Sequence, residues 1–298
     1  MLKWNNQISD EGLLRLELLD GRALANQLTD EQTLAVDLLK QQGVTPKLVV
    51  IMVGEDPASA IYTRNKQKRA TKIGMASVLK KMSAETTEAE LLAVVEAYNQ
   101  DQTVDGILVQ LPLPPQINED RVIQTIDPNK DVDGFSPVNI GKLWMNQPGL
   151  VACTPQGVMA ILAAHKINVA GKNVVIVGRS NIVGRPLAAL MLNANATVTI
   201  AHSRTKHLQD LTKTADILVA AVGVAHLFGA ADVKPGAVVI DVGMNRLDDG
   251  TVTGDVDFEA VQDQVSAITP VPRGVGPMTI TMLMAQTIEI AKGRVKRG

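Results

Sequence analysis

Short runs of apolar residues recur along the chain and alternate with longer stretches of mixed apolar and polar residues. The apolar runs cover residues 48–53, 106–111, 174–177, 198–200, 217–221 and 238–242. Nearly continuous runs of this length are typical of strands buried on both faces, as in parallel sheets covered by helices. The alternation therefore predicts an α/β fold built on mostly parallel sheets.

The same pattern indicates two domains. Residues 57–73 have the mixed pattern of a helix, and Gly and Pro residues gather at 141–155, where we place a domain boundary. We expect a first domain at 1–146 and a second at 147–277, a division that a chain of 298 residues accommodates well. A last helix, taken as 278–298, is predicted to pack back on the first domain.

The composition narrows the possible partners. The net charge of −2 gives no electrostatic reason to expect binding to nucleic acid or to an anionic membrane, and aromatic residues, at 2%, are too few to stack single-stranded bases. The sequence has no apolar run of about 18 residues that would span a membrane, and the N-terminal stretch MLKWNNQISDEG lacks the apolar core of a signal peptide. We therefore expect a soluble cytoplasmic protein.

The cysteine and histidine content indicates neither a disulfide nor a metal site. Cys153 is the single cysteine, so an internal disulfide is impossible and a reducing compartment is expected. The four histidines lack the spacing of metal ligands, and Asp131 and Asp133 lack the other acidic positions of a calcium loop. We expect Cys153 to be a buried packing residue and the protein to bind no metal.

A loop with two glycines follows the apolar run at 174–177. Residues 177–188 read VGRSNIVGRPLA. Gly178 would allow a tight turn and Gly184 a close contact between helix and strand, with helix amides facing a phosphate. Ser180 stands in the middle of the loop, where a dinucleotide-binding loop usually has a glycine, and its hydroxyl could reach a phosphate. An ordinary strand–helix turn is the alternative.

The end of the next strand bears on the identity of the dinucleotide. A site for NAD usually has an acidic residue about 20 residues beyond the loop, where it binds the ribose hydroxyls. Here the strand at 197–201 ends in His-Ser-Arg-Thr, without a carboxylate. Ser203, Arg204 and the nearby Arg179 suit a ribose with a 2′-phosphate, since hydroxyl and guanidinium donors bind phosphate well. We favour NADP over NAD, with a solvated polar strand end as the alternative.

Tyr62 and Lys66, on the predicted helix 57–73, are candidates for a ligand-binding or catalytic role. Their i, i+4 spacing makes the aromatic ring and the amine project from neighbouring turns on one side. Such a pair can hold a flat heterocycle next to a proton-transfer group. A pair of this kind is, however, more often part of a solvated surface.

Two further polar residues stand where elements end. Gln110 closes the predicted strand 106–111, and open parallel sheets bind ligands outside the carboxyl ends of their strands. Asp133 precedes Gly134, and Asp-Gly is first of all a turn signal. A polar residue entering a loop is the alternative interpretation of both.

Together these segments resemble one family, the bifunctional methylenetetrahydrofolate dehydrogenase/cyclohydrolases of one-carbon metabolism. They occur in the family's order and span nearly the whole chain. The matching segments are Tyr62-xxx-Lys66, VQLPLP at 109–114, KDVDGF at 130–135, CTPQGV at 153–158, IVGRSNIVGRP at 176–186, HSRT at 202–205, DVGMNR at 241–246, GDVDF at 254–258 and TPVPRGVGPMT at 269–279.

The resemblance implies a homodimer of two-domain subunits, with a cleft between a folate-binding first domain and a Rossmann-type second domain that binds NADP. It also implies two reactions in that cleft. A hydride passes from 5,10-methylenetetrahydrofolate to NADP+, which gives 5,10-methenyltetrahydrofolate. Water then converts this cation to 10-formyltetrahydrofolate.

The resemblance also assigns roles to individual residues. Lys66 is expected to be the central catalytic residue, Gln110 its partner, and Asp133 the group that anchors the pterin. Tyr62 would stack on the aromatic part of folate, and the remaining substrate-binding positions are Pro272 and Gly276. The cofactor-binding positions are Gly178, Arg179, Ser180, Gly184, Ser203, Arg204, Val222 and Gly243.

Two segments depart from the family pattern. Arg273 stands where the family usually has a glycine, and it would be strained if the position required a positive φ. We expect a conformation that tolerates a side chain, with Arg273 pointing to solvent or toward the acidic folate tail. The loop Val224-Ala225-His226 lacks the expected lysine or proline, which bears on cofactor affinity.

Three alternatives to the bifunctional enzyme remain at this point. The first is a dehydrogenase without the cyclohydrolase step, against which Lys66 and Gln110 argue. The second is another two-domain dehydrogenase, acting on a shikimate-type or amino-acid substrate, which would need a different set of residues in the first domain. The third is an NADP-binding protein without catalysis.

Overall fold

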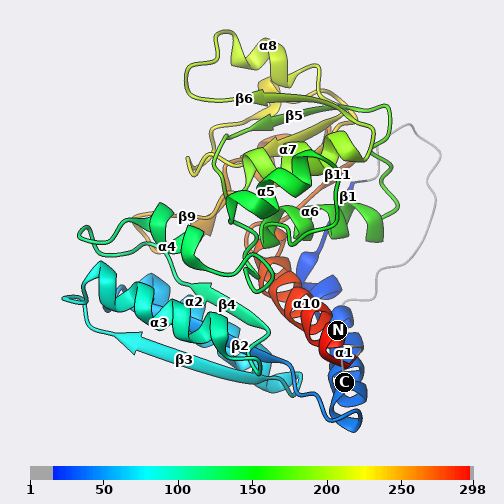
Figure 1. The fold of residues 1–298 in the computed structure, drawn as a ribbon. Helices are drawn as coiled ribbons and strands as arrows, with labels where there is room; N and C mark the ends of the chain where they lie inside the picture. Colours follow the sequence, from blue (N-terminus) through cyan, green and yellow to red (C-terminus); the bar gives the residue numbers. More distant parts are fainter. Residues whose placement is uncertain (1–15, 296–298) are drawn as a thin grey trace.

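The computed structural model describes residues 16–295 (Figure 1). The N-terminal stretch without a signal core and the last three residues of the predicted helix 278–298 lie outside the described residues. Within the described part of the chain, no helix is both long and apolar enough to cross a membrane.

Helices and strands alternate along the chain. The helices are α1 (Gly21–Gln41), α2 (Pro57–Lys72), α3 (Glu88–Gln100), α4 (Glu119–Thr125), α5 (Pro137–Trp144), α6 (Cys153–Ala164), α7 (Gly184–Asn193), α8 (Leu208–Thr212), α9 (Phe258–Val261) and α10 (Val275–Val295). The strands are β1 (Glu17–Leu18), β2 (Lys47–Val53), β3 (Ala76–Met82), β4 (Gly106–Val109), β5 (Asn173–Val177), β6 (Thr197–Ala201), β7 (Ile217–Ala220), β8 (Val238–Asp241), β9 (Asn245–Arg246), β10 (Val252–Thr253) and β11 (Ala267–Ile268).

The first half of the chain forms a three-stranded parallel sheet with the order β3-β2-β4. Leu48 and Val50 of β2 point to a core shared with α1, α2 and α10. Val49 and Ile51, on the opposite face, pack against α3 and α4. Burial on both faces explains why β2 is a continuous apolar run.

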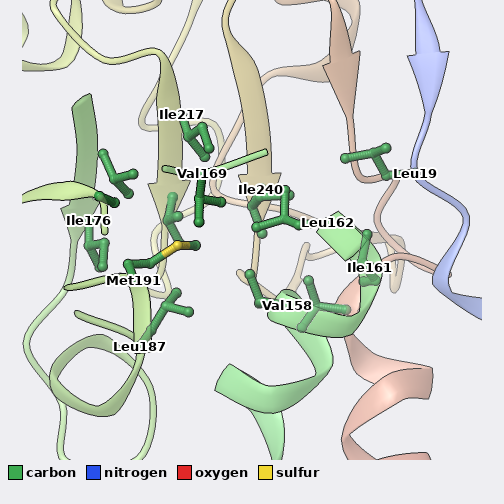
Figure 2. Close-up of a cluster of buried hydrophobic side chains, with 14 of the residues drawn as sticks. Leu19, Val158, Ile161, Leu162, Val169, Ile176, Leu187, Met191, Ile217 and Ile240 are labelled. Carbon is green, nitrogen blue, oxygen red and sulfur yellow. The ribbon is translucent and has the colours of Figure 1, made fainter. Parts of the chain in front are cut away.

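The second half forms a six-stranded parallel sheet with the order β1-β11-β8-β7-β5-β6. Figure 2 shows one of its cores, where Ile176 of β5 and Ile240 of β8 lie with Leu162 of α6. The chain leaves β5 toward β6 on one side and returns to β7 on the other. The strand order therefore reverses between β5 and β7, which is where open α/β sheets bind ligands at their carboxyl ends.

Both ends of the described chain connect the two halves. Strand β1 pairs with β11, so Glu17 and Leu18 belong to the second sheet although they precede the first. Helices α1 and α10 lie side by side (Figure 1). Helix α10 begins at Val275 rather than Met278, and its side chains enter cores of both sheets. The division of the chain at 146/147 stays a prediction. Strand β1 precedes this division in the sequence but belongs to the second sheet.

The turn before α10 corrects the expectation for Arg273. Its backbone φ is +98°, a region that side chains rarely adopt, and its guanidinium donates to Asp20 Oδ2 at 2.6 Å. The prediction of a backbone that tolerates a side chain was therefore wrong, whereas the Arg273 side chain is half exposed, in keeping with the prediction that it points to solvent. The turn is pressed against the start of α1, where Arg22 N donates to Arg273 O at 2.9 Å and Asp20 caps the helix.

Candidate active site

Lys66 and Gln110 meet at the carboxyl end of the first sheet. Lys66 lies in the middle of α2, its residue only 8% exposed, and its Nζ donates to Gln110 Oε1 at 3.0 Å. Gln110 follows β4 directly: its backbone N–H donates to Ile51 O at 2.8 Å, and its side-chain Nε2 donates to Leu111 O at 2.8 Å. The second bond turns the amide oxygen toward the amine. The predicted partnership of these two residues is thus present in the structure.

The loop that carries Asp133 is held by its buried neighbour Asp131. The Asp131 carboxylate accepts hydrogen bonds from Gly134 N at 3.1 Å, Ser136 N at 2.8 Å and Asn139 Nδ2 at 3.0 Å. Gly134 has a φ of +69°, and an added Cβ there would overlap the backbone of Val151. The loop therefore presents Asp133 in one defined position.

The Asp133 carboxylate differs from that of Asp131 in having no partner. Within residues 16–295, no group donates a hydrogen bond to it. Burial raises its pKa to about 6, while the positive charge of Lys66 acts against that rise and the negative charge of Asp131 adds to it. Asp133 therefore lies within electrostatic reach of Lys66, with acceptor oxygens free for a ligand that brings N–H donors.

Tyr62 lies on the exposed side of α2 and contacts the second half of the chain. Its residue is 43% exposed, and its hydroxyl donates to Met244 Sδ at 3.2 Å. The Met244 Cε lies 3.2 Å from the place where a Cβ at Gly276 would be. Met244 therefore connects two predicted substrate-binding residues. Sequence reasoning missed it, although it follows β8 within the quoted segment DVGMNR. Pro272 lies exposed in the turn before α10.

Behind this site, Cys153 is buried, as expected. Its Sγ donates to Val132 O at 3.1 Å, and burial raises the pKa of its thiol, which disfavours the thiolate. Gln286 of α10, which sequence reasoning also missed, donates to the same carbonyl at 2.7 Å and accepts from Val151 N at 2.9 Å. Among the described residues, no three His, Cys, Asp or Glu side chains gather as a metal site would require.

The loop after β5 is shaped by its two glycines. Gly178 has a φ of +133°, and an added Cβ would overlap the carbonyl oxygen of Ala221; a Cβ at Gly184 would overlap the carbonyl oxygen of Gly178. Helix α7 then begins at Gly184 without a side-chain cap. Arg185 N already donates to Ser180 O at 3.1 Å and Pro186 has no N–H, so among the described residues at the start of this helix the Gly184 amide is the one left for an anion. The Ser180 hydroxyl accepts from Val183 N at 3.2 Å and keeps its own hydrogen to donate.

The predicted phosphate-binding residues follow the carboxyl ends of β5 and β6, two adjacent strands of the second sheet. Val177 of β5 pairs in register with Ala201 of β6, and Arg179 and Ser203 each follow two residues later. Both residues are exposed, as is Arg204, and none of the ion pairs in the described chain involves either arginine. These donors, with the cradle at Gly178, fit a dinucleotide that carries a 2′-phosphate.

Two predicted cofactor-binding residues use their amides inside the protein. Val222 N donates to the Asp255 carboxylate at 2.7 Å, and Gly243 N donates to the Asp241 carboxylate at 2.9 Å. A contact between either residue and a cofactor would have to come from a carbonyl group or the Val222 side chain. In the divergent loop, His226 Nε2 lies 2.7 Å from Thr253 Oγ1.

The fold and this geometry define a two-domain α/β enzyme, with an amine, an amide and a carboxylate in one half and a glycine-led nucleotide loop in the other. Residues 19–133 match the model of the tetrahydrofolate dehydrogenase/cyclohydrolase catalytic domain, and residues 152–295 match that of the NAD(P)-binding domain of the same family. The chain belongs to the tetrahydrofolate dehydrogenase/cyclohydrolase family.

Relatives and solved structures agree with this assignment. The chain is 81% identical over 283 residues to the bifunctional protein FolD of Latilactobacillus sakei, covering 95% of this chain and 100% of the relative. FolD of Campylobacter jejuni has a crystal structure with a TM-score of 0.93 at 46% identity, covering 94% of this chain and 100% of the other. The FolD structure from Trypanosoma brucei, complexed with NADP and an inhibitor, has a TM-score of 0.90 at 36% identity, covering 94% and 99%.

Family membership confirms the predicted fold class. It also confirms an enzyme with methylenetetrahydrofolate dehydrogenase and methenyltetrahydrofolate cyclohydrolase activities, and the predicted cofactor, NADP, agrees with its NAD(P)-binding domain. The alternatives of another two-domain dehydrogenase and of a protein without catalysis are set aside. The roles of individual residues stay predictions.

We predict that Asp133→Asn stabilises the fold while it weakens folate binding. The folded-state pKa of about 6 lies above the ordinary 3.8, so the stability that the protonated group contributes is complete below pH 3.8 and is lost as the pH rises through about 6. At neutral pH the neutral variant should gain about 1–2 kcal/mol in the free energy of unfolding, a figure reduced for the partial exposure of this residue. Urea denaturation measures the gain.

The gain should shrink as the pH falls below about 6, because wild-type Asp133 is then protonated in the folded protein. Asp248→Asn, at an exposed turn, is the control and should leave the unfolding free energy unchanged. An Asp133→Asn protein that is less stable than wild type at neutral pH would contradict the prediction.

Proposed function

We propose that this enzyme oxidises 5,10-methylenetetrahydrofolate with NADP+ and then hydrolyses the product to 10-formyltetrahydrofolate at the same site. The observation that carries the proposal is the Lys66–Gln110 hydrogen bond beside a carboxylate, Asp133, that no protein donor occupies. A proton-carrying amine and an open acceptor are the two groups that hydrolysis of a bound pterin cation requires.

The substrate would be held by groups from both halves of the chain. Asp133 would accept hydrogen bonds from the amino and ring N–H groups of the pterin, because a carboxylate matches two adjacent donors. Tyr62 would stack on the aromatic ring that follows the pterin. Pro272, in the turn before α10, and Gly276, in its first turn, would line the other side, with Met244 between Gly276 and Tyr62.

The cofactor would be NADP, which supplies the hydride acceptor. Gly178 and Gly184 would bring backbone amides close to the pyrophosphate. Arg179, Ser203 and Ser180 would hold the 2′-phosphate, with Arg204 beside them at the end of β6. The first oxidation needs only correct placement of the two reactants, so these residues act by binding and orientation.

The hydrolysis would use Lys66 and Gln110 directly. The water oxygen bonds to the bridging methenyl carbon, the bond from this carbon to N5 breaks, and the formyl group stays on N10. Two protons leave the water oxygen, of which one goes to N5 and the other to solvent. Lys66 would carry these protons, and Gln110 would orient its amine without adding a negative charge that would hold a proton on it.

We also propose a cytoplasmic homodimer without nucleic-acid or membrane partners. The resemblance supports it. Among the described residues β3 pairs only with β2, so its other edge offers backbone groups to a second copy. Equilibrium sedimentation is expected to give twice the mass of the chain. A monomer mass at all concentrations would refute the dimer, and cell fractionation checks the location.

We predict that Lys66→Met abolishes the hydrolysis. The substitution keeps the length of the side chain but removes the group that carries protons, so the rate of methenyltetrahydrofolate hydrolysis should fall by about 10²–10⁴-fold. Loss of the methenyl absorbance measures the rate. Lys68→Met, on the exposed face of the same helix, is the control. Hydrolysis at the wild-type rate in the Lys66 variant would refute the assignment.

We predict that Arg179→Ala changes the choice of cofactor. Loss of a charge-assisted hydrogen bond to the 2′-phosphate should raise the KM for NADP+ by about 10- to 100-fold and leave the KM for NAD+ almost unchanged. Arg185→Ala is the control, because Arg185, in the first turn of α7, donates to Asn181 of the loop at 2.7 Å. Equal increases for both cofactors would show that Arg179 does not read the phosphate.

A further inference from the structure

Asp255 is a fully buried carboxylate that gathers donors from two separate loops. Its Oδ2 accepts from Val222 N at 2.7 Å and Gly223 N at 3.1 Å, both in the loop after β7. Its Oδ1 accepts from Val224 N in the same loop and from Asn245 Nδ2, which follows β8, each at 2.9 Å. One side chain therefore fixes the geometry of both loops.

The two loops border the two ligands that must react with each other. The loop after β7 begins at Ala221, whose carbonyl oxygen occupies the space that a Cβ at Gly178 would need, so it forms a wall of the cofactor turn. The loop after β8 carries Met244, which contacts Tyr62 across the domain boundary. The Asp255 carboxylate thus connects the loop after β7, which lies beside the cofactor turn, to the segment after β8, which contacts Tyr62.

Asp255 is itself held in place by Asp241 at the end of β8. Asp241 Oδ1 accepts from Asp255 N at 3.0 Å, and its Oδ2 accepts from Val256 N at 2.9 Å. A Cβ at Gly243 would overlap the Asp255 carboxylate, and a Cβ at Gly254 would overlap the Asp241 carboxylate. The two carboxylates and the two glycines therefore fit only in this arrangement.

The three consecutive amides at 222–224 form a concave group of donors of the kind that binds anions. Here the protein's own carboxylate fills it, so a cofactor phosphate cannot take that place. The role left to this loop is to support the uncharged part of the cofactor near the folate. A carboxylate is suited to this task because it accepts several hydrogen bonds at once and fixes all the donors together.

We propose that Asp255 is a positioning residue for hydride transfer, which sets the placement of the nicotinamide against the folate by holding the loops after β7 and β8 together. The inference rests on the proposed function. Hydride transfer depends steeply on the distance and angle between the reacting carbons. Hydrolysis depends instead on Lys66 and Gln110, which Asp255 does not contact. Asp255 therefore acts on one of the two reactions only.

Asp255→Asn tests this separation within a single protein. Asparagine keeps the size of the side chain but replaces one acceptor oxygen with an amide that donates, so at least one pair of hydrogen bonds is lost. We expect the dehydrogenase kcat to fall by about 10- to 100-fold. Hydrolysis of methenyltetrahydrofolate, assayed without NADP, should be unchanged, and calorimetry should show that NADP still binds. Deuterium on the methylene carbon should slow the variant more than wild type, since hydride transfer becomes rate-limiting.

Two further variants keep the test decisive if Asp255→Asn does not fold. Asn245→Ala removes only the bond from the folate-side loop and should lower the dehydrogenase kcat in the same selective way. Asp257→Asn, in a carboxylate that caps α9 two positions further on, is the control and should change neither reaction.

Equal loss of both reactions in Asn245→Ala would show a merely structural role, and an unchanged dehydrogenase in Asp255→Asn would refute the inference. Failure of the proposed function is distinguishable, because wild type itself would then lack one of the two activities.

Discussion

The packing of α10 against both sheets is the constraint on which the site depends. Met278 enters the core of the second sheet and Leu283 that of the first, so one rigid helix fixes where each sheet lies. Gln286 adds hydrogen bonds that hold the backbone beside Asp133 to the segment leading into α6. Gln32 of α1 donates to Thr281 O at 2.9 Å and ties the neighbouring helix to the same frame. The folate-side residues and the cofactor loop thereby share one support.

The buried carboxylates of the described chain have two different roles: some hold loops in place through hydrogen bonds, and one is free to bind a ligand. Asp131, Asp241 and Asp255 each accept several hydrogen bonds from backbone amides, which offset the cost of burying a charge. Burial raises the pKa of Asp241 to about 6 even so. Asp133 has the same burial-driven rise in pKa but no donors within the described chain. Its carboxylate oxygens therefore remain free to accept hydrogen bonds from a ligand.

The amino-acid pattern predicted the strands that are buried on both faces, because burial there leaves a continuous apolar run. It did not indicate β3, whose side chains are partly exposed at a sheet edge and include two lysines, or β1 and β11, which are two residues long and pair across the length of the chain. The Lys66–Gln110 pair followed from the resemblance alone, since local spacing connected Lys66 only with Tyr62. Met244 and Asp255 could not be assigned roles, since their partners depend on how distant loops meet. The positive φ of Arg273 is likewise imposed by the distant start of α1.

The position of α10 has a consequence for how the protein is made. During synthesis the strands of both sheets emerge before the helix that completes their cores, and the first sheet is finished some 165 residues before Val275. Its face at Leu48 and Val50 must wait for Leu283 and Ile288 to cover it. A nascent chain therefore carries exposed apolar surface until its last described helix leaves the ribosome, and during that interval it is a natural client for chaperones.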